Sequence, residues 1–137
     1  MRTAVDTNIL SIFWSGGPLA AGAEAQLSNA RIEGSLVISA PVFVELSAIP
    51  AGNARRIEQL LGEMRIATDF DLGEDVWKLA AEAFSAYAMR RRRSGGGSPK
   101  RMLADFVIAA HAQLQADRFM TRDANRYAMD FPNLRLI

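Results

Sequence analysis

Hydrophobic and polar positions follow two rhythms along this chain. Short, nearly all-apolar runs such as LVIS at 36–39 are bounded by glycine, proline or polar residues, as in strands buried on both faces of a sheet. The longer stretches between them repeat apolar residues every three or four positions, which is the period of an amphipathic helix. This alternation predicts an α/β fold, a sandwich of helices around a mainly parallel sheet.

The boundaries of these elements follow from the same pattern. We expect strands at 3–9, 36–39, 65–70, 118–121 and 134–137. We expect helices at 18–34, 41–49, 54–64, 73–93 and 98–114, and a short one after Asp123. Ser98 followed by Pro99 is a typical cap and first position of the fifth helix.

Length and composition restrict the class of protein. At 137 residues, residues 1–137 are expected to form a single domain with a full core. The chain lacks both an apolar run of membrane-spanning length and the pattern of a signal peptide, so we expect a cytoplasmic protein without membrane association. There is no cysteine and one histidine, which excludes thiolate chemistry and multi-histidine metal centres. Any metal site must therefore use oxygen ligands, which favours Mg²⁺ or Mn²⁺.

Three of four candidate acidic residues lie where the predicted topology gives them a shared position. Asp6 follows the core of the first strand, Glu45 lies in the helix after the second, and Asp123 follows the strand at 118–121. In a parallel sheet the carboxyl ends of the strands meet at one edge, which is where the functional crevice lies. Asp105 begins the helix that leads into the strand at 118–121.

Burial makes two of these acids unusual. Asp105 lies in RMLADFVIAAHAQL, a helix that is apolar almost all round, and the helical neighbours of Glu45 are also mostly apolar. Buried carboxylates need a cation, hydrogen bonds or a metal ion. An ion pair with an arginine is the alternative explanation for either residue, and helix capping is the alternative for Asp6.

Other chemistry-bearing residues have simpler interpretations. His111 lies six residues after Asp105, about 240° round an ideal helix, so a Ser-His-Asp triad is not expected. Trp77, Phe84 and Tyr87 follow helical spacing and are expected in the core.

Four segments in order, VDTNIL, PVFVEL, LADFVIAAHA and MTRDANRY, resemble the PIN-domain ribonucleases, and most of all the VapC-type toxins of bacterial toxin–antitoxin pairs. The resemblance spans nearly the whole chain and implies a three-layer sandwich with about five parallel strands. It implies Asp6, Glu45, Asp105 and Asp123 as the catalytic set, with Asp6, Asp105 and Asp123 as metal ligands and Asn8 and Thr121 as supporting groups. It also implies a Mg²⁺ or Mn²⁺ cofactor, RNA cleavage, a homodimer and a cognate antitoxin.

The distribution of charge adds a feature that the family resemblance does not explain. The net charge is +1, but six of the 16 basic residues lie in RRRRSGGGSPKR, leaving 10 basic against 15 acidic residues elsewhere. Because an acidic site repels RNA, this loop is expected to bind phosphates through Arg91, Arg92, Arg93, Lys100 and Arg101. The alternative is that the arginines complement the helix C-terminus and pair with surface acids.

Apolar residues after the first strand suggest a partner surface. Ile12, Phe13 and Trp14 precede a Gly-Gly-Pro turn and give a short connection more apolar surface than usual. They are expected either to fold back into the core or to bind an amphipathic antitoxin helix.

Two other functions compete with the nuclease. A haloacid-dehalogenase-like phosphotransferase needs a second aspartate two residues after the first, where this chain has Asn8. A non-catalytic PIN-like module that only binds RNA or a partner needs no carboxylate cluster. Metal-dependent shortening of RNA distinguishes an enzyme from such a module.

Overall fold

The order of strands and helices places a parallel sheet between two helical layers. The computed structural model describes residues 1–97 and 101–137. In this described part the strands are β1 (Arg2–Val5), β2 (Ser35–Ser39), β3 (Ile66–Asp69) and β4 (Arg118–Met120). The helices are α1 (Thr7–Ser15), α2 (Ala20–Glu33), α3 (Ala40–Ser47), α4 (Ala54–Glu63), α5 (Glu74–Arg93), α6 (Leu103–Gln115) and α7 (Ala124–Ala128).

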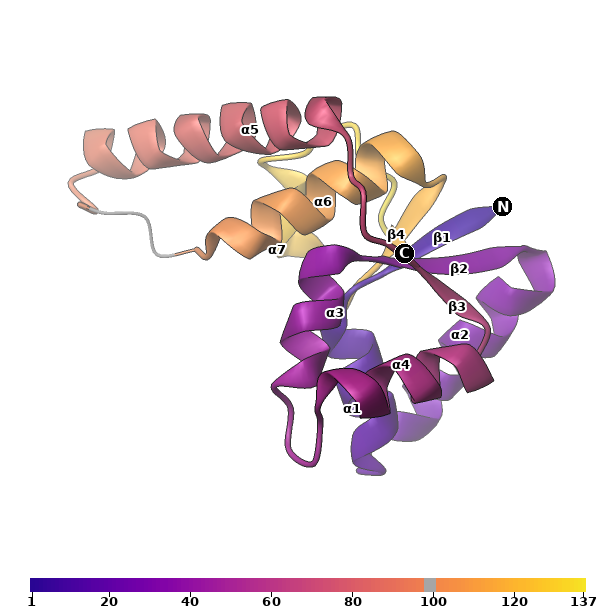
Figure 1. The fold of residues 1–137 in the computed structure, drawn as a ribbon. Helices are drawn as coiled ribbons and strands as arrows, with labels where there is room; N and C mark the ends of the chain where they lie inside the picture. The colour runs from indigo at the N-terminus through magenta and orange to yellow at the C-terminus, as the bar shows by residue number, and fades with distance from the viewer. Residues whose placement is uncertain (98–100) are drawn as a thin grey trace.

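The four strands form one parallel sheet in the order β3-β2-β1-β4. Helices α5 and α6 lie side by side on one face, and α1, α2 and α4 cover the other (Figure 1). This confirms the predicted α/β sandwich with a parallel sheet. The expected strand at 134–137 is reduced to an isolated bridge between Phe119 and Leu136.

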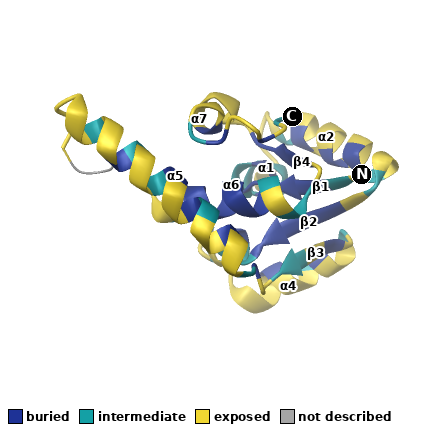
Figure 2. Ribbon diagram, turned by 90° about the horizontal axis from the view of Figure 1, so that it is seen from above, coloured by how far each residue is buried: buried dark blue, intermediate teal, exposed yellow. Residues whose placement is uncertain are grey.

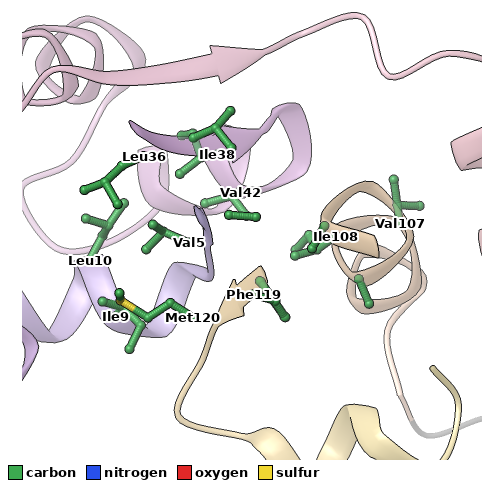
Figure 3. Packing of buried hydrophobic residues seen from close by; sticks show 14 of the residues in the cluster. Val5, Ile9, Leu10, Leu36, Ile38, Val42, Val107, Ile108, Phe119 and Met120 are labelled. Atoms are coloured by element: carbon green, nitrogen blue, oxygen red, sulfur yellow. The ribbon is translucent and has the colours of Figure 1, made fainter. Parts of the chain in front are cut away.

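The core lies between the sheet and both helical layers. Val5, Ile38 and Phe119 come from three strands and are at most 1% exposed. They pack with Ile9 from α1 and Ile108 from α6 (Figure 3). Helix α6 is buried from Asp105 to Ala112, as its apolar sequence predicts. Burial is concentrated in the sheet and α6, whereas much of α5 is exposed (Figure 2).

The first strand is shorter than its sequence predicts. Strand β1 ends at Val5, and helix α1 occupies residues that we expected to be strand and connection. Asp6 caps this helix by accepting a hydrogen bond from the Thr7 amide, and Gly16 ends it with a left-handed backbone, φ 67°. Ile9 and Leu10 are buried on a helix face as completely as strand residues would be, so the apolar run does not distinguish a strand from a helix.

Helix α6 begins at Leu103, later than the expected start at residue 98. Ser98 and Pro99, the predicted cap, lie outside the described residues. On α5, Phe84 and Tyr87 are half-buried against the core, but the prediction for Trp77 was wrong, because this residue is 52% exposed. In the described part of the chain, none of the helices has the length and apolar character needed to cross a membrane.

Candidate active site

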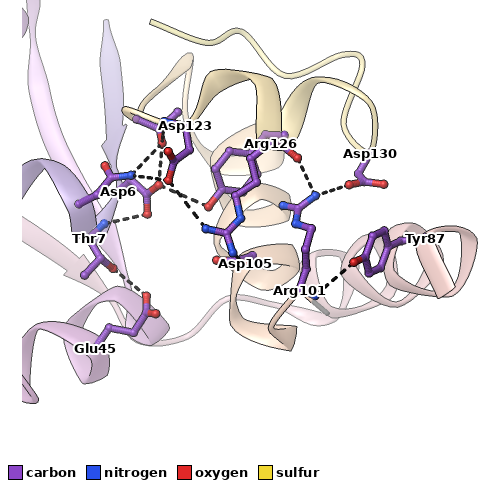
Figure 4. Close-up of polar contacts among 12 residues, drawn as sticks. Asp6, Thr7, Glu45, Tyr87, Arg101, Asp105, Asp123, Arg126 and Asp130 are labelled. Atoms are coloured by element: carbon purple, nitrogen blue, oxygen red, sulfur yellow. Dashed lines mark hydrogen bonds and ion pairs between the residues drawn. The ribbon is translucent and has the colours of Figure 1, made fainter. Parts of the chain in front are cut away.

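The predicted acids occupy the carboxyl edge of the sheet, as the topology requires (Figure 4). Asp6 follows β1 directly, Glu45 lies in α3 after β2, and Asp123 lies just beyond β4. Asp105 is in the first turn of α6. Asp6 and Asp105 are buried, Glu45 is half-buried rather than buried as predicted, and Asp123 is exposed.

Asp6 is the most heavily hydrogen-bonded of the four. Its Oδ1 accepts a hydrogen bond from the Thr7 amide at 2.8 Å. Its Oδ2 accepts one from the Thr121 hydroxyl at 2.7 Å and one from the Tyr127 hydroxyl at 3.3 Å. Asp6 is therefore both the cap of α1 and a member of the acidic site, so the two interpretations of this residue are compatible.

The environment of Asp6 disfavours its negative charge. Burial raises the pKa of Asp6 to about 6, the hydrogen bonds from Thr121 and Thr7 oppose this rise, and the charges of Glu45 and Asp105 add to it. Burial also raises the pKa of the Tyr127 hydroxyl well above its ordinary value, so this hydroxyl stays protonated and donates to Asp6. The negative charge of a carboxylate held in this way is stabilised when a cation approaches.

Glu45 and Asp123 are each positioned by polar residues of α1. The Thr7 hydroxyl donates a hydrogen bond of 2.7 Å to Glu45 Oε1. The Asn8 amide nitrogen donates to Asp123 Oδ2 at 3.2 Å and lies 3.4 Å from Thr121 Oγ1. The Thr121 hydroxyl in turn accepts a hydrogen bond from the Asp123 amide at 3.1 Å. Asn8 and Thr121 thus connect the ends of β1 and β4, in positions that fit supporting groups.

Asp105 lies against a guanidinium group. Arg126 Nη2 is 2.9 Å from Asp105 Oδ2, and Arg126 Nη1 is 3.8 Å from Asp123 Oδ2. Asp105 Oδ2 is buried and has no partner with acceptable hydrogen-bond geometry, so the short contact to Arg126 is an ion pair without alignment. The arginine pairing that we considered for Asp105 is therefore present.

The donors suit a hard divalent cation, although Arg126 lies among them. Asp6, Asp105 and Asp123 supply only carboxylate oxygens, and Asp105 Oδ2 is a buried acceptor without a hydrogen bond. As they stand, the side chains of residues 1–97 and 101–137 include no group of three or more Asp, Glu, His or Cys arranged to hold a metal ion. The donor chemistry therefore fits Mg²⁺ or Mn²⁺, and the guanidinium of Arg126 lies among the acids.

The basic residues are divided between two environments. Arg92 and Arg93 are exposed at the end of α5, and Arg91 is half-buried and donates to the Gly96 carbonyl. Arg101 is enclosed: its side chain is 12% exposed, pairs with Asp130 and lies over the Phe106 ring at 4.8 Å. The guanidinium of Arg101 is thus committed to the protein interior. Lys100 lies outside the described residues.

Three residues of the site were missed by the sequence analysis. Thr7 holds Glu45, Tyr127 donates to Asp6, and Arg126 contacts two acids. Arg126 follows Asp123 by three residues, a helical spacing that brings side chains together and was the available signal. His111 belongs elsewhere: its Nε2 is 2.7 Å from Asp69 Oδ2, and burial lowers the pKa of this histidine.

Comparison with known families identifies the class. The family model described as PIN domain matches residues 3–132, so the chain belongs to the PIN domain family. PIN domains are generally nucleases and typically use divalent metal ions. A search of curated proteins found no match.

Solved structures with the same fold include VapBC and FitAB proteins. VapBC2 from Rickettsia felis, bound to a DNA fragment from its promoter, is 17% identical with a TM-score of 0.66 and covers 100% of this chain and 98% of its own. VapBC-1 from nontypeable Haemophilus influenzae is 21% identical with a TM-score of 0.64, covering 100% and 97%. FitAcB from Neisseria gonorrhoeae is 22% identical with a TM-score of 0.62, covering 98% and 96%. These similarities establish the fold.

Proposed function

We propose that the chain is a Mg²⁺-dependent endoribonuclease and the toxin of a toxin–antitoxin pair. The observation that carries the proposal is the placement of four carboxylates from different elements along the carboxyl edge of a PIN-domain sheet. Membership of a family of nucleases supports the reaction class. The match in fold to VapBC and FitAB proteins supports the toxin assignment.

In this proposal three of the acids bind the metal ion and the fourth acts on the attacking water. Asp6, Asp105 and Asp123 hold Mg²⁺ or Mn²⁺, and Asn8 and Thr121 keep Asp6 and Asp123 oriented. A bound divalent cation supplies electrostatic stabilisation to an attacked phosphate and lowers the pKa of water. Glu45, which the Thr7 hydroxyl fixes, orients the attacking water and accepts its proton.

RNA is attracted by the basic end of α5. Arg90 pairs with Asp130, which lies just beyond α7, and the exposed Arg92 and Arg93 follow it at the end of α5. We assign phosphate binding to Arg91, Arg92 and Arg93, and Lys100 retains its predicted role. Arg101 takes a smaller part than its sequence position suggests, because Asp130 and the Arg126 carbonyl already engage it.

The antitoxin is assigned to the outer surface of α1. A hollow of about 530 Å³ lies between α1 and the α3–α4 segment, lined by Trp14, Ile49, Pro50 and Leu60 among others. A second hollow, of about 200 Å³, lies between α1 and α2 and includes Phe13 and Leu27. Both suit the apolar face of an amphipathic helix. The chain is also proposed to form a homodimer, which sedimentation equilibrium measures.

Cleavage of total RNA tests the enzyme directly. In Mg²⁺ or Mn²⁺ the wild type shortens RNA and in EDTA it does not, whereas Asp105→Asn lowers the rate by about 100-fold, because an amide does not replace a charged oxygen ligand. Glu58→Gln, which removes an exposed acid from α4, is the matched control and cleaves normally.

The same assay separates the nuclease from its alternative. A non-catalytic module retards RNA on a gel without shortening it in any metal ion. If the wild type behaves in this way with a verified divalent ion present, the proposed function is wrong.

A further inference from the structure

Arg126 forms ion pairs with two residues of the acidic site. One guanidinium contacts both Asp105, at 2.9 Å, and Asp123, at 3.8 Å. Two of the three proposed metal ligands therefore already share a positive charge that belongs to the protein itself. Figure 4 shows the Arg126 side chain between them, reaching from α7 toward α6.

We propose that Arg126 is a resident counter-cation that occupies the space of the divalent ion and must be displaced when the ion binds. The inference rests on the proposed function, because it takes the carboxylates to be metal ligands. It adds a residue that controls metal affinity to those that hold the metal.

The contact is built to be released. Asp105 Oδ2 receives no aligned hydrogen bond from Arg126, so the pair depends on charge alone. The Arg126 side chain is 42% exposed, which lets its guanidinium turn into solvent without leaving a buried cavity. The helix beneath it stays in place, because the Arg126 carbonyl accepts a hydrogen bond of 2.6 Å from Arg101 Nη1.

Charge makes the two cations mutually exclusive. A guanidinium within 4 Å of two carboxylates would stand a few ångströms from a divalent ion on the same oxygens, where the repulsion is at least comparable to thermal energy even in water. The outward movement of Arg126 also frees Asp123, which is exposed and joined to the site through Asn8. This accounts for the spacing of the acids, which are not arranged to hold a metal while Arg126 lies among them.

Metal binding in the absence of RNA tests this displacement. By isothermal titration with Mn²⁺, Arg126→Gln should bind the ion about tenfold more tightly than the wild type, because no competing charge has to leave. The matched control is Arg122→Gln, which removes an exposed arginine from the connection between β4 and α7 and should change the affinity by less than about twofold. Arg126→Lys keeps a charge but not the planar guanidinium that spans two carboxylates. Its Mn²⁺ affinity should lie between those of the wild type and Arg126→Gln.

Thermal melting gives a second, independent measurement. In EDTA, Arg126→Gln should melt below the wild type and below Arg122→Gln, because the acids have lost their counter-charge. In saturating Mn²⁺ this deficit should vanish, since the ion replaces the arginine.

The outcomes separate this inference from the proposed function. If the wild type binds no Mn²⁺, the metal site itself is wrong. If it binds Mn²⁺ and Arg126→Gln binds equally or more weakly, or stays less stable in saturating Mn²⁺, Arg126 is a permanent structural partner and the inference is overturned while the nuclease stands.

Discussion

At the scale of single residues, the site combines groups whose charges are unfavourable with groups that restrain them. Asp6 illustrates the balance, because burial raises its pKa to about 6 even though two hydroxyls and a backbone amide donate to its oxygens. The acid is held in place by contacts that do not remove the cost of its charge. Metal-free protein therefore stores part of the free energy that cation binding releases.

The pKa of Asp6 predicts how stability changes with pH. Its pKa is higher in the folded chain than in the unfolded chain, so between about pH 4 and 6 the folded chain binds more protons than the unfolded chain. The stability of the fold therefore falls as the pH rises from about 4 through 6. Asp6→Asn keeps the helix cap but not the charge, so in EDTA its stability relative to wild type should increase by up to about 3 kcal/mol between pH 4 and 7.

Urea unfolding at four pH values measures this difference. Glu58→Gln, the exposed control, should show a constant difference from the wild type. A flat profile for Asp6→Asn would contradict the account of Asp6. In saturating Mg²⁺ at pH 7 the wild type should gain stability and Asp6→Asn should gain less.

At the scale of elements, α5 ends in the basic segment of the chain. Its first turn is acidic and its last turn carries Arg90, Arg91, Arg92 and Arg93, as the helix dipole favours. Arg90 pairs with Asp130, so the surface pairing that we considered is present for one arginine. Dipole complementation and RNA binding are compatible, because an exposed arginine can do both.

Salt dependence tests the RNA role of α5. Changing Arg91, Arg92 and Arg93 to Gln should weaken RNA binding across many sequences and lower the slope of log affinity against log salt by up to about three. The control changes three exposed arginines elsewhere, Arg55, Arg65 and Arg135, and should alter the slope less. An unchanged slope in the first triple variant would show that the α5 arginines do not contact phosphate.

At the scale of the whole molecule, residues of helix α1 contribute both to the acidic edge and to the grooves beside this helix. Asp6 caps α1, Thr7 and Asn8 in its first turn hold Glu45 and Asp123, and Phe13 and Trp14 further along reach the two hollows. A partner seated along α1 would therefore contact the helix that organises the active site.

Hydrogen exchange tests that partner surface. Binding of the neutralising antitoxin should slow exchange around Phe13 and Trp14, and Trp14→Ala should weaken the complex by about tenfold or more, because a tryptophan in a groove is a typical binding hot spot. Trp77→Ala, on the exposed face of α5, is the control and should bind normally. Unchanged exchange at Phe13 and Trp14 would exclude this surface.

The sequence by itself was enough to predict the alternation of strands and helices, the parallel sheet and three of the acids at its edge, because the hydrophobic period is a local property and the carboxyl ends of parallel strands share one edge. Asp105 joined this set through the family resemblance. Helix α1, the enclosure of Arg101 and the partners of Asp69 and Asp130 were decided only by the tertiary structure. A fully buried apolar run is compatible with strand or helix, so the pattern at Ile9 and Leu10 did not distinguish them. Which arginine meets which acid depends on contacts between segments far apart in sequence: Arg101 and Asp130 are 29 residues apart, and Arg126 reaches Asp105 only because α7 packs beside the start of α6.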